Sequence, residues 1–135
     1  MFRLIVLMRI LGIDYGRKKV GLAISEGKLA EPWKVIKVNN FEEAVIKVLQ
    51  VLQVLQADKV IVGVSENKMA EESKKFALAL SHQSLAIVET FDETLSTYGA
   101  KKLSISAGMK RIKRKEFEDA FAACIMLQSY LDKYV

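Results

Sequence analysis

The hydrophobic pattern of this chain changes once along its length, and that change limits the fold more than any other feature. Three short segments come first, at residues 9–14, 20–25 and 33–38, separated by turns that contain Gly16 and Gly27. Segments of this length, either apolar or alternating, are typical of strands, and short connections favour antiparallel pairing. The first part of the chain is therefore predicted to be an antiparallel meander.

Helical and strand-like segments alternate in the rest of the chain. Asn40 with Glu43 three residues later has the capping-box pattern, which predicts a helix that runs to about Gln56. The pattern then predicts a strand at 59–64, a helix at 70–81, a strand at 85–90, a helical segment at 95–104 and a terminal helix at 116–133.

A meander followed by strand–helix alternation predicts an α/β fold, with a mixed five-stranded sheet and helices on both faces. The length of 135 residues and the lack of a linker-like stretch predict one domain over residues 1–135. Ligands of such sheets bind beyond the carboxyl ends of the strands. We therefore look for a site where the first, fourth and fifth strands end.

Composition restricts the chemistry of any site. Cys124 is the only cysteine and cannot form an internal disulfide, which favours a reducing cytoplasm. Its apolar helical surroundings predict core packing, not catalysis. His82 is the only histidine, so a His-rich metal site is excluded, and we expect it at the surface near a helix end. The net charge of +5 permits a polyanionic partner.

The first eleven residues are apolar but too short to span a membrane, and Arg3 and Arg9 interrupt them. No small-residue cleavage site follows, so we expect neither a signal peptide nor membrane association. Residues 1–7 are interpreted as an extension of the first strand or, if Met8 is the native start, as residues that precede the domain. The pattern leaves the oligomeric state open between a monomer and a weak homodimer.

Acidic residues follow two of the predicted strands. Asp14 ends the first strand, where a carboxylate is costly to place unless it is paired or metal-bound. The alternative is a turn acid that bonds its own backbone. Asp92 and Glu93 follow the fifth strand, and Asp92 could instead cap the next helix. We take Asp14 and Glu93 as candidate ligands and keep Asp92 as an additional candidate acid.

A third acid, Asp119, lies on the terminal helix. The apolar arc of this helix is centred near Leu127, and Asp119 lies at the edge of that arc, beside the small side chains of Ala122 and Ala123. Small side chains let a helix approach a sheet closely, so an acid here could reach the strand ends. The alternative is a first-turn acid that complements the helix dipole.

Asp14, Glu93 and Asp119 would offer carboxylate oxygens without histidine or cysteine partners. Such hard ligands favour Mg²⁺ or Mn²⁺ over zinc. One or two such ions can activate a water molecule and stabilise a leaving oxygen, which is sufficient for hydrolysis of a phosphodiester. The pattern therefore indicates these three acids as both metal ligands and catalytic residues.

Two clusters of basic residues flank the candidate acids. One cluster follows Asp14 and the other precedes the helix that carries Asp119. Their members are Arg17, Lys18, Lys19, Lys110, Arg111, Lys113, Arg114 and Lys115. Such clusters suit a nucleic-acid backbone, whose affinity for proteins comes largely from phosphate contacts. The alternative is a pair of solvated loops, since charge runs are usually only that.

Three segments resemble motifs of the YqgF (RuvX-like) family, described both as Holliday junction resolvases and as pre-16S rRNA nucleases. They are residues 11–25, LGIDYGRKKVGLAIS, residues 92–97, DETLST, followed by Ala100, and residues 119–131, which begin DAFAA and end LQSYL. The resemblance implies a ribonuclease H-like fold with Asp14, Glu93 and Asp119 as the acidic site. It also implies a structured nucleic-acid substrate, with ribosomal RNA precursors first and branched DNA second.

Two departures from the family pattern keep other functions open. Residues 63–70, GVSENKMA, lack the usual proline and later glycine, and Thr94 stands where the family tends to carry arginine. Both changes bear on rate and substrate choice, and they leave room for a nucleic-acid-binding or ribosome-assembly factor with weak or no catalysis. An actin-like ATPase is a further alternative, but it would need two domains around the nucleotide.

Overall fold

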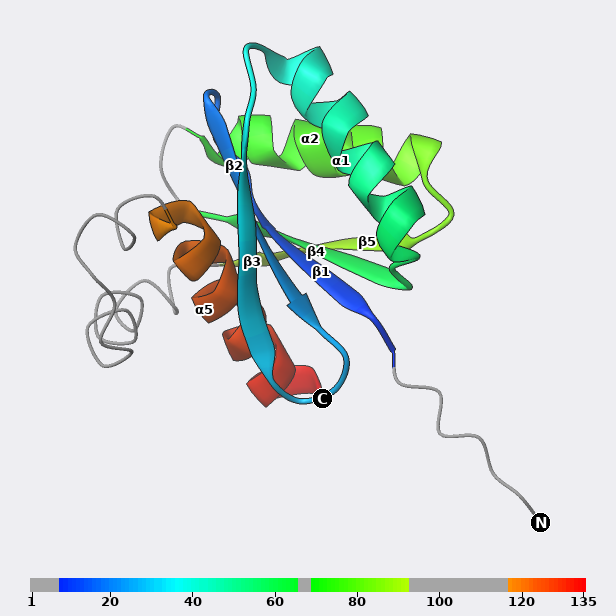
Figure 1. Cartoon of the computed structure of the whole chain (residues 1–135), viewed down its shortest axis with the longest axis vertical. Coiled ribbons are helices and arrows are strands. Elements are labelled where there is room, and N and C mark those ends of the chain that lie inside the picture. Colours follow the sequence, from blue (N-terminus) through cyan, green and yellow to red (C-terminus); the bar gives the residue numbers. More distant parts are fainter. Residues whose placement is uncertain (1–7, 66–68, 93–116) are drawn as a thin grey trace.

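The computed structural model describes residues 8–65, 69–92 and 117–135. Five strands form one sheet in the order β3-β2-β1-β4-β5 (Figure 1). The antiparallel part consists of β1 (Ile10–Asp14), β2 (Lys19–Ser25) and β3 (Ala30–Lys37). The strands β4 (Lys59–Val64) and β5 (Ile87–Asp92) extend the sheet in parallel from β1. The predicted mixed five-stranded sheet is therefore confirmed.

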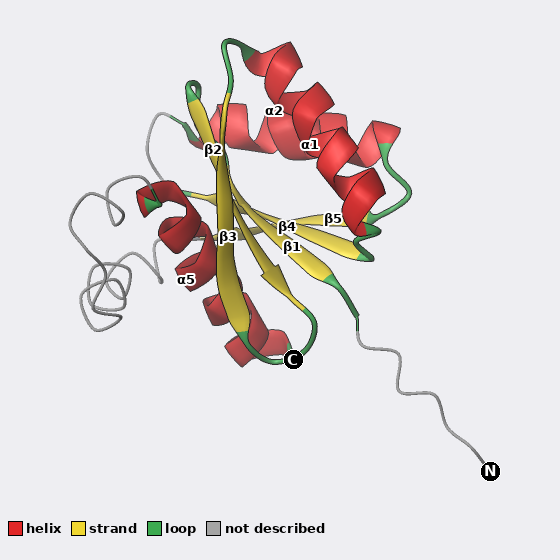
Figure 2. Cartoon of the chain, in the orientation of Figure 1, coloured by secondary structure: helices red, strands yellow, loops and turns green. Residues whose placement is uncertain are grey.

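Helices cover both faces of this sheet (Figure 2). The helices α1 (Phe41–Leu55) and α2 (Ala70–Gln83) lie on one face, and α5 (Glu118–Tyr134) lies on the other. Alternate residues of each strand point to opposite faces. Leu11 and Ile13 of β1 accordingly belong to the core under α1 and α2, and Ile10 belongs to the core under α5.

Most element boundaries agree with the sequence prediction, and two strands differ from it. β3 begins at Ala30 rather than at residue 33, because Pro32 pairs with Ala23 next to a register shift in the β2–β3 ladder. An edge strand tolerates proline, whose missing N–H can face away from the neighbouring strand. β5 is displaced toward its carboxyl end, to Ile87–Asp92. The predicted helical segment at 95–104 lies outside the described residues.

The amino end of α1 shows half of the predicted capping box. The Asn40 side chain accepts a hydrogen bond from the Glu43 backbone N–H at 2.8 Å. The Glu43 carboxylate does not return to the cap residue: it accepts from the Asn39 side chain at 3.1 Å and pairs with Lys47 at 2.9 Å. The helix closes at Gln56, whose φ of 55° is left-handed.

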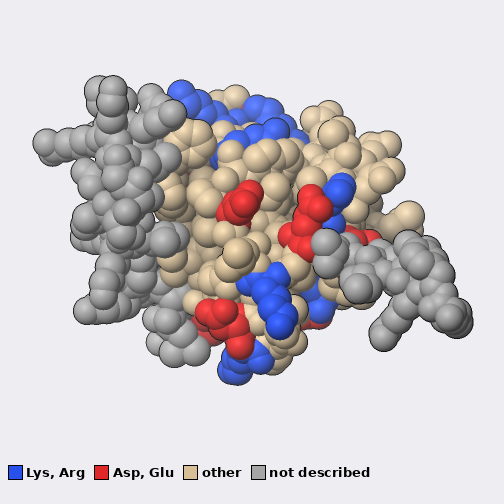
Figure 3. Space-filling view, turned by 60° about the horizontal axis from the view of Figure 1, so that its bottom comes forward, with Lys and Arg blue, Asp and Glu red and all other residues tan. Residues whose placement is uncertain are grey.

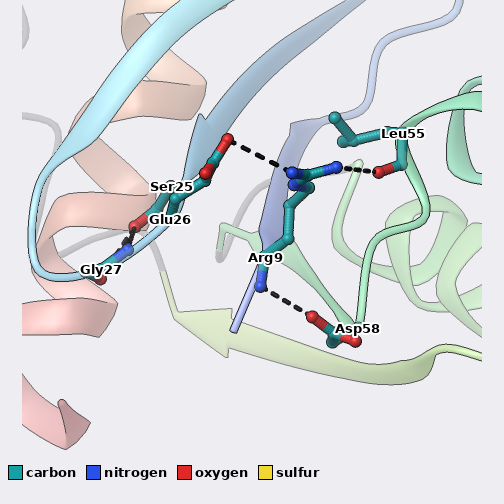
Figure 4. A network of polar contacts seen from close by, with 6 residues as sticks. All are labelled: Arg9, Ser25, Glu26, Gly27, Leu55 and Asp58. Atoms are coloured by element: carbon teal, nitrogen blue, oxygen red, sulfur yellow. Dashed lines mark hydrogen bonds and ion pairs between the residues drawn. The ribbon is translucent and has the colours of Figure 1, made fainter. Parts of the chain in front are cut away.

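Arg9 fastens the amino end of β1 to its neighbours (Figure 4). Its backbone N–H donates to the Asp58 carboxylate at 2.8 Å, and its guanidinium donates to the Leu55 carbonyl at 2.7 Å. The same guanidinium lies 3.6 Å from the Glu26 carboxylate in the β2–β3 turn. These contacts lie at the end of β1 opposite to Asp14, so they fix the strand without occupying the candidate site.

Cys124 and His82 lie where the sequence predicts them. Cys124 is buried in α5, and burial raises the pKa of its thiol to about 11. His82 is exposed in the last turn of α2. Among the described residues, no helix combines the length and the apolar character that a membrane crossing requires.

Candidate active site

Asp14 is the last residue of β1 and lies on the face of the sheet that α5 covers. Alternate residues of a strand face the same side of the sheet, so Asp14 shares its face with Ile10 and Gly12. Both of these residues lie against α5. The residue is half-buried. Asp14 therefore places a carboxylate at the carboxyl end of a central strand, as the sequence predicts.

The first turn of α5 lies directly on β2 at Gly21. Gly21 is the register partner of Asp14 in the antiparallel β1–β2 pair. A Cβ added to Gly21 would overlap the carbonyl group of Asp119 and would lie 2.9 Å from the backbone nitrogen of Ala120. The glycine thus brings the backbone of Asp119 to the strand position that is paired with Asp14. This register places the first turn of α5, which carries Asp119, beside the end of β1 that carries Asp14.

Asp119 has an unusual electrostatic environment. Burial raises the pKa of its carboxyl group, the nearby Lys19 opposes that rise, and Glu118 adds to it. A carboxylate that is taken out of water gains more from a bound cation than an exposed one does. Burial of Asp119 therefore makes a positive charge beside its carboxyl group, from a bound proton or from a cation, more favourable than it would be at an exposed carboxylate.

The acids after the fifth strand are only partly described. Asp92 is the last residue of β5 and is exposed. Glu89 bonds the α5 residue Tyr130, and Phe91 packs in the core under α5. Strand alternation consequently places Asp92 on the other face of the sheet, away from the face of Asp14. Glu93, the other predicted ligand, lies outside the described residues.

The turn after Asp14 is anchored to α2 by Glu72. The Glu72 carboxylate accepts a hydrogen bond from the Tyr15 hydroxyl at 3.0 Å and from the Arg17 guanidinium at 2.8 Å. The ring of Tyr15 stacks on Phe76 with centroids 4.6 Å apart. Burial, reinforced by the bond to Glu72, raises the pKa of Tyr15 to about 12. Arg17 is thus partly neutralised, although its side chain remains 71% exposed.

Of the remaining basic candidates, two lie within the described residues and five lie outside them. Lys18 and Lys19 are exposed at the start of β2. The second cluster, Lys110, Arg111, Lys113, Arg114 and Lys115, lies outside the described residues. On the face shown in Figure 3, acidic and basic side chains are interspersed, with basic groups gathered along one margin. Base-independent backbone binding by these residues stays a prediction.

The donor set at this place fits a hard divalent cation. Within residues 8–65, 69–92 and 117–135, no group of three histidine, cysteine or acidic side chains that could hold a metal is present. The described site offers the carboxylates of Asp14 and Asp119. Mg²⁺ typically keeps several waters and binds through one or two carboxylates together with substrate phosphate oxygens. This pair is therefore suited to Mg²⁺ or Mn²⁺ and not to a closed zinc site.

The sequence prediction missed two residues that position the candidate site, Gly21 and Glu72. Gly21 looks like an ordinary strand residue until the β1–β2 register places it opposite Asp14. A glycine inside a strand is a signal of close backbone approach, and that signal was available in the sequence. Glu72 has no such signal, because its link to Tyr15 and Arg17 depends on the packing of α2 against the sheet.

Curated relatives match almost the whole chain. A protein of Bacillus cytotoxicus named "Putative pre-16S rRNA nuclease" is 38% identical, over 93% of this chain and 98% of its own length. A protein of Desulforamulus reducens with the same name is 32% identical, over 93% of this chain and 97% of its own length.

Solved structures with the same fold include Holliday junction resolvases. RuvC of T. thermophilus in complex with a Holliday junction substrate superposes with a TM-score of 0.64 at 18% identity, over 93% of this chain and 96% of that one. The fowlpox virus resolvase in complex with Holliday junction DNA gives a TM-score of 0.63 at 19% identity, over 95% and 99%. These likenesses confirm the predicted ribonuclease H-like fold.

The family itself is shown by a profile match. The profile of the RuvX family, described as Holliday junction resolvase, matches residues 8–133, which include Asp14 and Asp119. The motif resemblance, the fold and the relatives agree with this match. The chain belongs to the RuvX family.

Proposed function

We propose that this chain is a metal-dependent endonuclease that hydrolyses phosphodiester bonds in structured nucleic acid, with ribosomal RNA precursors as its substrate. The observation that carries the proposal is the meeting of Asp14 and the α5 turn of Asp119 across Gly21. Two carboxylates held at the carboxyl end of a central strand, in a family described by nuclease names, suit cation-assisted phosphodiester hydrolysis.

In this proposal Asp14, Glu93 and Asp119 hold one or two Mg²⁺ or Mn²⁺ ions. The bound metal would supply an activated water and charge stabilisation for the leaving oxygen. The rigid β1–β2 pair orients Asp14, and the close contact at Gly21 holds the first turn of α5 in place. Asp92 is the weaker candidate, because it lies on the face of the sheet opposite to that of Asp14.

The basic residues would hold the phosphate backbone on either side of the cut. Lys18 and Lys19 follow the turn after Asp14, and the cluster at residues 110–115 precedes the helix of Asp119. Such contacts are independent of sequence and weaken with salt. The substrate would then be chosen by its shape, since none of these residues provides readout of base edges.

The choice of RNA over branched DNA follows from the curated relatives. Proteins at 32% and 38% identity carry the name of a pre-16S rRNA nuclease. The resolvases that resemble the fold share only 18% or 19% identity with this chain. A ribosomal RNA precursor in the cytoplasm is therefore the first substrate to test, and a four-way DNA junction is the second.

The proposal is tested by measuring how one protein preparation cleaves an RNA substrate and a DNA substrate. Labelled precursor 16S rRNA and a labelled four-way junction are incubated with Mg²⁺, with Mn²⁺ or with EDTA, using wild type beside Asp14→Asn. We expect metal-dependent cutting of the RNA that EDTA and the substitution both abolish. Tight binding without cutting in either metal would replace the nuclease by a binding factor, and Thr94 and residues 63–70 would then be the first positions to restore.

A further inference from the structure

Two lysines face each other across the β2–β3 ladder beside the candidate active site. Lys19 is the register partner of Lys37, and both side chains are exposed. Residues directly opposite in an antiparallel pair have Cβ atoms roughly 5 Å apart. Lys37 lies outside both basic clusters of the sequence, so only the strand register reveals the pair.

The pair lies on the α5 face, next to Asp119. Lys19 follows the alternation of Gly21, on which the first turn of α5 rests. Lys37, opposite Lys19, shares that face. Lys19 is near enough to Asp119 for its charge to act on that carboxyl group. Lys19 thus lies beside Asp119, and Lys37 adjoins Lys19 on the same face of the sheet.

The backbone around Lys37 is fixed from two sides. The Lys37 carbonyl accepts a hydrogen bond from the Lys47 side chain of α1 at 2.9 Å. The next residue, Val38, donates its N–H to the Lys18 carbonyl at 2.9 Å. These contacts tie the end of β3 to the turn that follows Asp14, so the position of Lys37 relative to the site is set by the fold.

Two neighbouring basic side chains are paired with acids, unlike Lys19 and Lys37 within the described part of the chain. Arg17 pairs with Glu72 at 2.8 Å, and Lys47 pairs with Glu43 at 2.9 Å. Among the ion pairs formed within the described part of the chain, neither Lys19 nor Lys37 takes part. Like charges directly opposite each other on two strands destabilise the pair. A bound anion between the two ammonium groups would remove that repulsion.

We propose that Lys19 and Lys37 together bind one phosphodiester group of the substrate strand, adjacent to the group that is cut. The choice of a nucleic-acid phosphate as the ligand rests on the proposed nuclease function. The new element is Lys37, which extends the binding surface from the turn after Asp14 onto β3. A strand held by this pair would run along the start of β2 toward the acids.

Salt-dependent binding tests this pair without needing cleavage. The full chain carrying Asp14→Asn is titrated with fluorescently labelled precursor 16S rRNA and with a labelled four-way junction over a range of KCl concentrations. We expect Lys37→Gln to weaken binding several-fold. Lys19→Gln together with Lys37→Gln should reduce the slope of log affinity against log salt by roughly 0.7–0.9, as expected for one lost phosphate contact.

Lys28→Gln is the matched control. It removes the same charge from the same β2–β3 hairpin, but from the turn at the end opposite to Lys37. Its affinity and salt slope should stay near those of the parent protein. The melting temperature of Lys37→Gln should not fall, because the substitution relieves a repulsion instead of breaking a stabilising contact.

The outcomes separate this inference from the nuclease proposal. If Lys37→Gln binds like Lys28→Gln while wild type cuts RNA or DNA, the lysine pair is wrong and the nuclease stands. If Lys37→Gln weakens binding but wild type cuts neither substrate, the pair stands and the nuclease fails. If the parent protein binds neither substrate and wild type cuts neither, both are overturned.

Discussion

The backbone carbonyl of Asp119 lies against Gly21, at the position where any other residue would carry its Cβ. Gly21 is also the register partner of Asp14. One glycine therefore determines how closely the amino end of α5 approaches β2, and with it the distance between the two acids. The arrangement requires an interior strand position without a side chain, although glycine is otherwise unfavourable in strands.

Gly21→Ala should damage stability and activity together. The added methyl group would overlap the Asp119 carbonyl, so the first turn of α5 would have to move. Overpacking of this kind typically costs about 1–3 kcal/mol, which urea denaturation would measure. Metal-dependent cleavage should fall further than stability alone explains, because Asp119 is displaced.

Gly27→Ala is the control for this substitution, because a Cβ there would meet nothing within 4 Å. It should change the urea midpoint and the cleavage rate very little. If Gly21→Ala unfolds at the same urea concentration as Gly27→Ala and cuts as fast, the contact between Gly21 and Asp119 does not set the site.

Glu72→Gln should reveal a pH-dependent link between the turn after Asp14 and α2. The bond from Arg17 is the main reason why the pKa of Glu72 lies below its ordinary value near 4.5. A lowered carboxyl pKa in the folded state stabilises the protein above the unfolded pKa, and this stabilisation is lost as the pH falls through the folded value. Near neutral pH, wild type should therefore unfold at a higher urea concentration than Glu72→Gln. This difference between the two urea midpoints should disappear as the pH falls below about 4.5.

Glu71→Gln provides the comparison for Glu72→Gln. Glu71 is the preceding residue of the same helix, and its ion pair with Lys74 is exposed and 3.6 Å long. Exposed pairs of this kind contribute little to stability. An equal pH dependence for the two variants would show that the Glu72 contacts do not hold the turn.

The thiol of Cys124 should resist modification in the folded protein. The residue is 2% exposed, and burial raises its pKa to about 11. At pH 8 only about 0.1% of such a thiol is the reactive thiolate. Labelling with a chromogenic disulfide should be negligible in native buffer and complete in concentrated urea. Fast stoichiometric labelling of the native protein would contradict the packing of α5 on the sheet.

Local periodicity was sufficient to predict much of this fold. The strand β1, which ends at Asp14, and the strand β4 were predicted from short apolar runs. The helix α1 was predicted from its Asn40 cap. The placement of Asp119 beside the sheet was predicted from its position at the edge of the apolar arc of α5. These features depend on residues that are close together in sequence, which is why pattern alone determines them.

Register and helix packing were not accessible in the same way. That Lys19 faces Lys37, or that Gly21 faces Asp14, depends on how strands align and on a register shift within the β2–β3 ladder. The engagement of Arg17 by Glu72 depends on where α2 packs. Asp92 shows the same limit, because its face of the sheet is fixed only once Phe91 is known to pack under α5.

The central claim is that Asp119 acts with Asp14 on a divalent cation, and one comparison tests it most directly. The rate of Mg²⁺-dependent cleavage of labelled precursor 16S rRNA is measured for wild type, Asp119→Asn and Glu118→Gln. Glu118 is the neighbouring acid of the same helical turn and is exposed. We predict that Glu118→Gln cuts like wild type. Asp119→Asn should cut at least roughly 10–100-fold more slowly than wild type, because loss of a residue that only hydrogen-bonds a metal ligand already costs that much activity. Equal cleavage by Asp119→Asn and Glu118→Gln would contradict the claim.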